Sequence, residues 1–505
     1  MSDNFLHGIE LLEIDDGGRT IRTVKSSVIG LVGTAPEASM ARLATLSLGT
    51  GNAQLTLTAK AVGIVGNSLR LQLRAATEPN TPLSIALDTQ TPGVTLIQVT
   101  LATDATGTRQ STAAEVAAAL LADATIADLV AVTVGSDASG VGVTGAGIVA
   151  TTLGSRGLSG GFDEPFPLNV PVLVTNQRMA AHLGRSGTLP IAMTGIYDQA
   201  MPFVYVVRVA EGANLDETLT AVIGGTDPAT GQLTGIAALL ETRSEMKSRI
   251  LIASGFSQHK PVADALLTVA QKTRAIAVID GPNTNDEAAI DYRSLFGSDR
   301  AYIVDPWFVV RDKDGSQRPE APSARVAGLI AQSDEARGFW FSPSNQVVNG
   351  VLRTTRPISW ALNDADTQAN YLNEFSVATF VAHEGVRLWG NRTCATDSRW
   401  AFLSVRRTAD MINESLVKAH LWAVDRNITR TYVSEVTEMA NAYLRQLKAK
   451  AAILGGRCWA DPELNTPQAI ADGRVYFDFD FTAPYPAEHI VFRSHLVGDY
   501  LEEIL

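Results

Sequence analysis

The stretch HEGVRLWGNRTC, residues 383–394, concentrates side chains that could do chemistry. It holds a histidine, a glutamate, two arginines, a tryptophan, an asparagine and a thiol. His383 and Glu384 could begin an H-E-x-x-H helix, in which two histidines one turn apart bind zinc and the glutamate acts as the base. No second histidine follows at that spacing. As the signature of a metalloprotease, the stretch therefore fails.

Other signatures of catalysis fail as well. The glycine-rich GGTDPATGQ lacks the lysine and spacing of a phosphate loop, and no G-x-S-x-G nucleophile elbow occurs. The seven histidines are scattered without ligand spacing: His7, His182, His259, His383, His420, His489 and His495. The sequence thus predicts no metal, no cofactor and no enzymatic activity. A hydrolase whose triad is assembled from distant residues stays open as the enzyme alternative, because a triad is defined by geometry.

Four of the five arginines between positions 387 and 407 are considered as one group: Arg387, Arg392, Arg406 and Arg407. One interpretation is a solvated arginine face. The other is a groove that receives carboxylates from elsewhere, because guanidinium groups form two-pronged pairs that lysine cannot form. The local pattern leaves both open.

The composition limits the choice of partners. At 505 residues the chain is too long for one core, so two to four domains are expected. There are 53 acidic against 41 basic residues, a balance that argues against nucleic acid as a partner. We find no pattern of a signal peptide or a membrane span. Cys394 and Cys458 are expected to be free thiols, with a disulfide as the alternative.

The chain that must position these residues divides into three segments with different sequence patterns. Residues 39–161 contain no aromatic residue, yet NSLRLQLR alternates with a period of two, and Thr112 with Glu115 forms a capping box. We interpret this segment as an inserted β-rich domain, with a disordered linker as the alternative. Short apolar runs such as FVYVVRV and AIAVID, separated by helical patterns, predict an α/β domain over 162–378.

Residues 379–505 have an α+β pattern. One helix is expected to bury Ile412, Leu416, Ala419 and Ala423 on one face, and a second to bury Val436, Ala440, Tyr443 and Leu447. VYFDFDF alternates as a strand with its three phenylalanines on one side. The chain as a whole is therefore predicted to be an α/β multidomain protein.

Four blocks, in order, resemble contractile phage tail sheath proteins, especially those of temperate myophages and R-type bacteriocins. They are residues 7–36, 171–209, 322–351 (PSARVAGLIAQSDEARGFWFSPSNQVVNGV) and the region that ends in HEGVRLWGNRTC. Residues 39–161 interrupt the resemblance. The motif positions to which we give a structural role are Gly328, Gly338, Trp340, Asn345, Gly385, Trp389 and Gly390.

The resemblance implies a structural subunit that stacks in hexameric rings around a tail tube and contracts to drive the tube through the host envelope. It implies a subtilisin-like α/β middle domain without catalytic residues, and partners in the tube, baseplate and tail terminator proteins. It places the chain in the virion, after synthesis in the host bacterial cytoplasm, with neither nucleic acid nor membrane insertion. The alternative is the sheath of a related bacteriocin or type VI-like injection system.

The resemblance also implies that terminal arms exchange strands between subunits. Residues 1–38 would supply an N-terminal arm and the first strand of the sheath core, and the last residues a C-terminal arm of the C-terminal sheath domain. The residues expected in the exchanged strands are Ile9, Leu11, Ile14, Ile490, Phe492 and Leu496. The acidic ends of the chain are expected to pair with the arginines at 387–407 of a neighbour, and the insertion to face outward.

Overall fold

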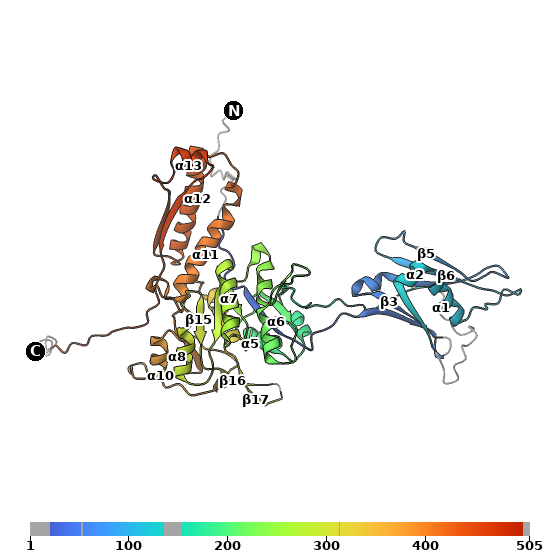
Figure 1. The fold of residues 1–505 in the computed structure, drawn as a ribbon, viewed down its shortest axis with the longest axis horizontal. Coiled ribbons are helices and arrows are strands. Elements are labelled where there is room, and N and C mark those ends of the chain that lie inside the picture. Colours follow the sequence, from blue (N-terminus) through green and yellow to red (C-terminus); the bar gives the residue numbers. More distant parts are fainter. Residues whose placement is uncertain (1–20, 52–53, 136–153, 313, 498–505) are drawn as a thin grey trace, which may run out of the picture. The chain divides into compact units, whose positions relative to one another are not determined.

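The computed structural model describes residues 21–51, 54–135, 154–312 and 314–497, and the chain divides into two compact units (Figure 1). The core unit comprises Met1–Glu37 and Leu168–Leu505. The inserted unit comprises Ala38–Pro167. Each unit is described by itself.

A six-stranded sheet forms the centre of the core unit, in the order β15-β14-β13-β1-β10-β9. All neighbouring pairs are parallel except β10 and β9. The strands are continuous apolar runs, as expected for strands that are covered on both faces. Their bounds are β1 Ile29–Thr34, β9 Val172–Val174, β10 Val204–Val209, β13 Ile250–Ile252, β14 Ile276–Asp280 and β15 Ala301–Val304. The predicted, largely parallel α/β sheet is confirmed.

Helices cover both faces of this sheet. α7 (Lys260–Thr273) and α9 (Ser323–Ala336) each pack against β13 and β14, whose residues are all buried. α5 (Thr188–Tyr197) packs against α9 and β1. The other helices of this part are α4 Gln177–Ala180, α6 Leu215–Ile223, α8 Asp286–Ser294 and α10 Gln368–Glu374.

Small sheets surround the main one. β16 (Phe308–Arg311) lies between β17 (Gln317–Glu320) and β18 (Arg353–Thr354), and β19 (Thr379–Ala382) forms a hairpin with β20 (Val386–Trp389). A further two-stranded sheet pairs β11 Gly225–Thr226 with β12 Leu233–Thr234.

Two long helices and a hairpin make up the C-terminal part of the core unit: α11 Leu403–Ala419, α12 Arg430–Ala449, β21 Gly455–Ala460 and β22 Phe477–Thr482, with the short α13 Pro467–Ala471 between the strands. The predicted face of α12 is buried, and the phenylalanines of β22 pack against the same apolar cluster. Of the face predicted for the first helix, Ala423 lies beyond its end, because α11 stops at Ala419.

The inserted unit contains two sheets around an aliphatic core. A three-stranded sheet has the order β2-β3-β7 and a four-stranded sheet the order β5-β6-β4-β8. Their bounds are β2 Leu43–Leu48, β3 Leu55–Val62, β4 Leu69–Ala75, β5 Ser84–Asp88, β6 Thr95–Leu101, β7 Val130–Val134 and β8 Gly154–Gly157, with helices α1 Ala113–Ala122 and α2 Ala124–Leu129.

The local predictions for this segment are confirmed. Leu69, Leu71 and Leu73 are buried in alternation along β4, and both hydrogen bonds of the capping box between Thr112 and Glu115 are formed. The described part of the segment is folded, which contradicts the alternative of a disordered linker. In neither unit is any described helix long and apolar enough to cross a membrane.

Candidate functional site

Two of the four arginines predicted to form an interface are buried inside the chain. Arg406 and Arg407 lie on α11, and only 8% and 3% of their surfaces are exposed. Arg407 donates to Asp334 of α9 (2.6 Å) and Arg406 to Asp410 (2.9 Å). The expectation of a groove open to a neighbour's carboxylates is corrected for these two residues, because both guanidinium groups already pair with carboxylates of the same subunit.

The same helix carries carboxylates that hold cations of the α/β part. Asp410 accepts two hydrogen bonds from Arg300, at 2.7 and 2.9 Å. Glu414 forms ion pairs with three cations: Lys247, Arg249 and Arg274. Burial acts to raise the pKa of Glu414, but these cations outweigh it and hold the pKa below its usual value. The pairs therefore fix α11 to the α/β part, since loss of one partner would leave a buried charge uncompensated.

Arg387 and Arg392 lie nearer the surface. Arg392 donates to Glu488, at 2.7 Å, so it already has a carboxylate partner on the C-terminal segment. Arg387 donates to two backbone carbonyl oxygens, at 2.8 and 3.0 Å, and the nearest carboxylate is that of the exposed Glu384, at 3.5 Å. Among the four arginines, Arg387 is thus the most available to a carboxylate from outside.

The chemically suggestive stretch 383–394 forms a β-hairpin and the loop after it. Residues 383–385 make the turn between β19 and β20, and the rest passes through β20 into the loop. His383 is exposed, and its ring lies 5.3 Å from that of Trp360, which also packs edge-on against Trp389. Within the described ranges, no three His, Cys, Asp or Glu side chains are placed to hold a metal ion.

The predicted motif residues lie where the chain turns or packs closely. A Cβ on Gly328 would stand 2.8 Å from the carbonyl oxygen of Ile196, so α9 approaches α5 closely there. At Gly390 (φ 150°), it would stand 2.7 Å from Ala378. Two other motif glycines lie where the chain turns: Gly338 follows α9, and Gly385 lies in the hairpin turn. The backbone N–H of Asn345 donates to the carbonyl oxygen of Leu388 (2.6 Å). Trp340 packs on Phe339, and Trp389 packs on Trp360.

A buried carboxylate that sequence reasoning missed lies at the end of β14. Asp280 is fully buried and accepts hydrogen bonds from the hydroxyls of Ser257 (2.6 Å) and Ser323 (2.9 Å) and from the backbone N–H of Gly255 and Ser323. Burial raises its pKa, and the hydrogen bonds oppose that shift. The group ties β14 to the start of α9, and among the described residues no histidine hydrogen-bonds to this carboxylate, as a Ser-His-Asp triad would require. Its partners lie 23 and 43 residues away, too far for a local motif.

The C-terminal segment leaves the body after a short anchor. Tyr485 packs edge-on against Phe402, and Glu488 accepts the hydrogen bond from Arg392. Beyond this anchor, residues 489–497 form neither helix nor strand (Figure 1). Ile490 and Phe492 are 67% and 94% exposed, and Leu496 is fully exposed. Three predicted arm residues are thus presented to solvent; the N-terminal ones, Ile9, Leu11 and Ile14, lie outside the described residues.

The hairpin of β21 and β22 is a second feature of the C-terminal part. It is a two-stranded sheet, paired in register from Gly455–Thr482 to Ala460–Phe477, and it packs against α12. Neither strand pairs with a third strand among the described residues. A two-stranded sheet with open edges offers unpaired backbone groups to another extended segment.

Comparisons with known proteins agree on one family. Residues 228–394 match the phage tail sheath protein central domain, and residues 395–496 match the phage tail sheath C-terminal domain. A protein described as a prophage major tail sheath protein of Pseudomonas aeruginosa strain UCBPP-PA14 is 41% identical over 67% of this chain and 88% of its own length. The tail sheath protein of Escherichia phage P2 is 36% identical over 68% and 89%.

The tail sheath protein of Burkholderia phage BcepMu is 30% identical over 99% of this chain and 98% of its own, so that alignment includes the inserted unit. Among solved structures, the sheath complex of the extracellular contractile injection system PVC in its contracted state has a TM-score of 0.53 at 17% identity, covering 66% of this chain and 89% of the other. The contracted helical sheath of the anti-feeding prophage has a TM-score of 0.51 at 19% identity, covering 65% and 88%. The chain therefore belongs to the family of contractile phage tail sheath proteins.

Proposed function

We propose that the chain assembles with copies of itself into stacked hexameric rings around a tail tube, and that neighbours are joined by exchange of their terminal arms. The observation that carries this proposal is the C-terminal segment 489–497. A single chain that exposes Ile490, Phe492 and Leu496 on an extended segment leaves apolar surface that only another partner can cover. A relative that forms a helical sheath, the anti-feeding prophage, supports self-assembly.

The open hairpin of β21 and β22 is the proposed acceptor. An extended segment that adds to a sheet edge gains main-chain hydrogen bonds, while its alternate side chains set the register. Ile490, Phe492 and Leu496 share the even-numbered side of an extended segment, so they would face the same side of the enlarged sheet. With about five ladder bonds at ~1 kcal/mol each, one exchanged strand contributes on the order of 5 kcal/mol before apolar burial is counted.

The α/β part serves as a rigid body in this proposal. A mostly parallel sheet with helices on both faces is compatible with the subtilisin-like topology that the family resemblance implies. The buried carboxylate Asp280 is engaged in structural hydrogen bonds, in line with a body that does no catalysis. Contraction is then a rearrangement of rigid bodies that stay joined by their arms.

The proposal extends to the rest of the particle. The sheath would act in the virion after synthesis in the bacterial cytoplasm, with the tube, baseplate and terminator proteins as partners. A solved baseplate of the anti-feeding prophage that matches this fold supports association with a baseplate. The inserted unit would face outward, away from the tube. The acidic chain ends would pair with Arg387 of a neighbour, the predicted interface arginine with the weakest carboxylate pairing in its own chain.

Negative-stain electron microscopy of the purified chain tests the assembly. We expect long striated tubes from the full chain and none from a chain that ends at residue 488, which keeps the anchor but lacks the arm. A matched control replaces His489 and His495 by Gln, which keeps the apolar residues of the arm. Tubes from the shortened chain would contradict strand exchange; compact particles from the full chain, even with tube and baseplate proteins, would contradict the sheath assembly.

Deletion of the inserted unit, by joining Pro36 to Phe166, tests its outward position. Tubes of normal width should still form. A folded deletant that fails to assemble would show instead that the unit contributes to contacts between rings.

A further inference from the structure

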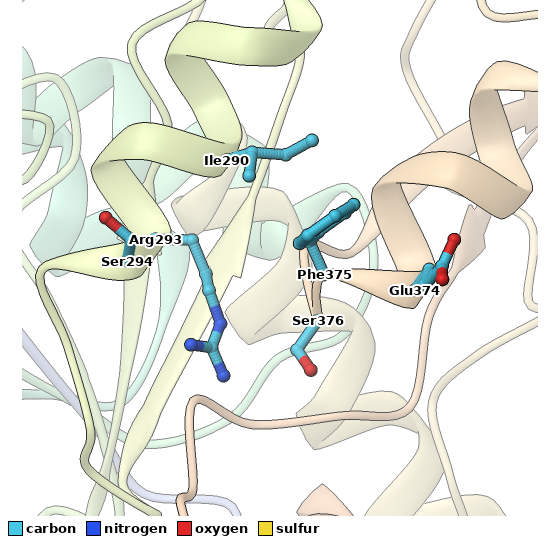
Figure 2. A pocket seen from close by; sticks show the side chains of 6 residues that line it. All are labelled: Ile290, Arg293, Ser294, Glu374, Phe375 and Ser376. Atoms are coloured by element: carbon cyan, nitrogen blue, oxygen red, sulfur yellow. The ribbon is translucent and has the colours of Figure 1, made fainter.

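A small pocket in the α/β part contains an arginine without an acceptor. Its volume is about 200 Å³, and it is lined by Ile290, Arg293 and Ser294 around the end of α8 and by Glu374, Phe375 and Ser376 after α10 (Figure 2). Within the described residues, the Arg293 side chain has no hydrogen bond or ion pair, and its Nε atom is buried and unsatisfied. Glu374 does not supply the partner, because its side chain points away from Arg293, on the other side of Phe375 (Figure 2).

Arg293 differs from most of the buried arginines of the core unit. Six arginines that are more than four-fifths buried each reach a carboxylate within the chain: Arg249, Arg300, Arg325, Arg356, Arg406 and Arg407. A guanidinium group that loses part of its hydration without gaining an acceptor is costly, so the remaining N–H groups favour an incoming anion. A carboxylate suits them because it can accept two parallel hydrogen bonds.

The other side chains that line the pocket indicate which kind of residue would lie next to the bound carboxylate. Ile290 and the half-exposed ring of Phe375 present an apolar surface, while the Ser376 side chain points to the same side of the pocket as the Arg293 guanidinium (Figure 2). The pocket therefore fits a glutamate or aspartate with an aliphatic neighbour. A chain with 53 acidic and 41 basic residues has carboxylates in excess.

We propose that the pocket receives the segment 501–505 of a second copy of this chain. This segment reads LEEIL and carries two glutamates between aliphatic residues. The arm that leads to it does not cover its own chain, since Phe492 and Leu496 are exposed. The inference rests on the proposed self-assembly and adds a second point of attachment, where Glu502 or Glu503 pairs with Arg293 and a neighbouring Leu or Ile packs on Phe375.

Binding of a labelled peptide with the sequence GDYLEEIL, followed by fluorescence anisotropy with the full-length protein, tests the pocket. We expect R293Q to weaken binding at least tenfold, and a peptide with both glutamates changed to glutamine to lose as much. R293Q should fold normally, because the Arg293 side chain makes no hydrogen bond that the change would break. The control R353Q removes an exposed arginine without an ion pair among the described residues and should bind like the parent. Absence of binding, or equal affinity for R293Q, would overturn the proposal.

Disulfide trapping separates this proposal from sheath assembly itself. In S376C/E503C tubes, we expect a ladder of linked chains on a non-reducing gel, and no ladder from S84C/E503C. The native thiols give little background because both are free and buried, and burial raises the pKa of Cys394 to about 12. Tubes without a ladder would overturn the pocket proposal and leave the sheath assembly standing. If the full chain forms no tubes, the assembly fails and the pocket proposal with it.

Discussion

The core unit and the inserted unit are stabilised by different kinds of contact. The C-terminal part of the core unit is held to the α/β part by buried ion pairs, such as Arg407 with Asp334 and Arg300 with Asp410. The core of the inserted unit consists of Leu, Ile, Val and Ala, and its cluster contains no charged or aromatic residue. Buried pairs demand one geometry, whereas an aliphatic core tolerates small shifts. In the core unit, the ion pairs thus fix the orientation of the C-terminal part against the α/β part. In the inserted unit, apolar packing stabilises the fold.

The largest expected effect follows from breaking the Arg407–Asp334 pair. R407A would leave Asp334 buried without its cation, which costs roughly 3–5 kcal/mol of the stability of the core unit. Chemical denaturation followed by tryptophan fluorescence measures it, because every tryptophan lies in the core unit. R399A is the matched control, since the pair of Arg399 with Asp397 is exposed. A loss in R407A no larger than in R399A would contradict the comparison.

A cavity in the inserted unit should have a smaller, separate effect. Leu71 is buried at the centre of β4, and L71A is expected to cost about 2–4 kcal/mol of the stability of that unit. Native-state hydrogen exchange resolves the two units, and the loss should be confined to Ala38–Pro167. The variant should still form tubes. Equal destabilisation of the core unit would show that the units unfold together.

The pH dependence sharpens the comparison in the core unit. The pKa of Glu414 is below its usual value in the folded state, so ionised Glu414 contributes stability above the pKa of the unfolded chain. That contribution is lost as the pH falls from about 5 through the folded pKa. E414Q should therefore lose less stability than the parent chain between pH 6 and pH 3, as measured by denaturation at each pH. Parallel curves for the two proteins would contradict a role for the cations around Glu414.

The smallest effect concerns the capping box of α1. T112A removes the hydroxyl that accepts from the Glu115 N–H, and should cost about 1 kcal/mol of the stability of the inserted unit. Hydrogen exchange of the first turn of α1 measures it. T112S keeps an acceptor and should lie within a few tenths of a kcal/mol of the parent. If T112S falls as far as T112A, methyl packing rather than capping is responsible.

What could be predicted from the sequence was local. Alternation along β4, the capping box at Thr112 and the apolar face of α12 depend on residues a few positions apart, and each is present in the structure. The burial of Arg406 and Arg407 was not predictable in this way. Asp334 lies 73 residues from Arg407, and Arg300 lies 110 residues from Asp410, so only the folded chain shows that these charges meet.

Of the two proposed contact sites, the C-terminal arm could be predicted from the sequence and the pocket at Arg293 could not. The family resemblance marked the last residues as an arm, and the structure shows Ile490, Phe492 and Leu496 exposed. The pocket at Arg293 gave no signal, because its walls come from two segments about eighty residues apart that carry ordinary compositions. An unpaired arginine is visible only once every neighbouring carboxylate has been placed.

The two ends of the inserted unit are tied to each other. Arg42 and Phe162 exchange backbone hydrogen bonds of 2.8 and 3.2 Å, and Thr45 pairs with Ser159 in the same way. The chain thus enters and leaves the unit at one place, so its excision would leave a gap that a short loop can close. In evolutionary terms the unit is a cassette: a sheath gene can gain, lose or exchange it in one step, and selection can change its residues without altering those of the core unit.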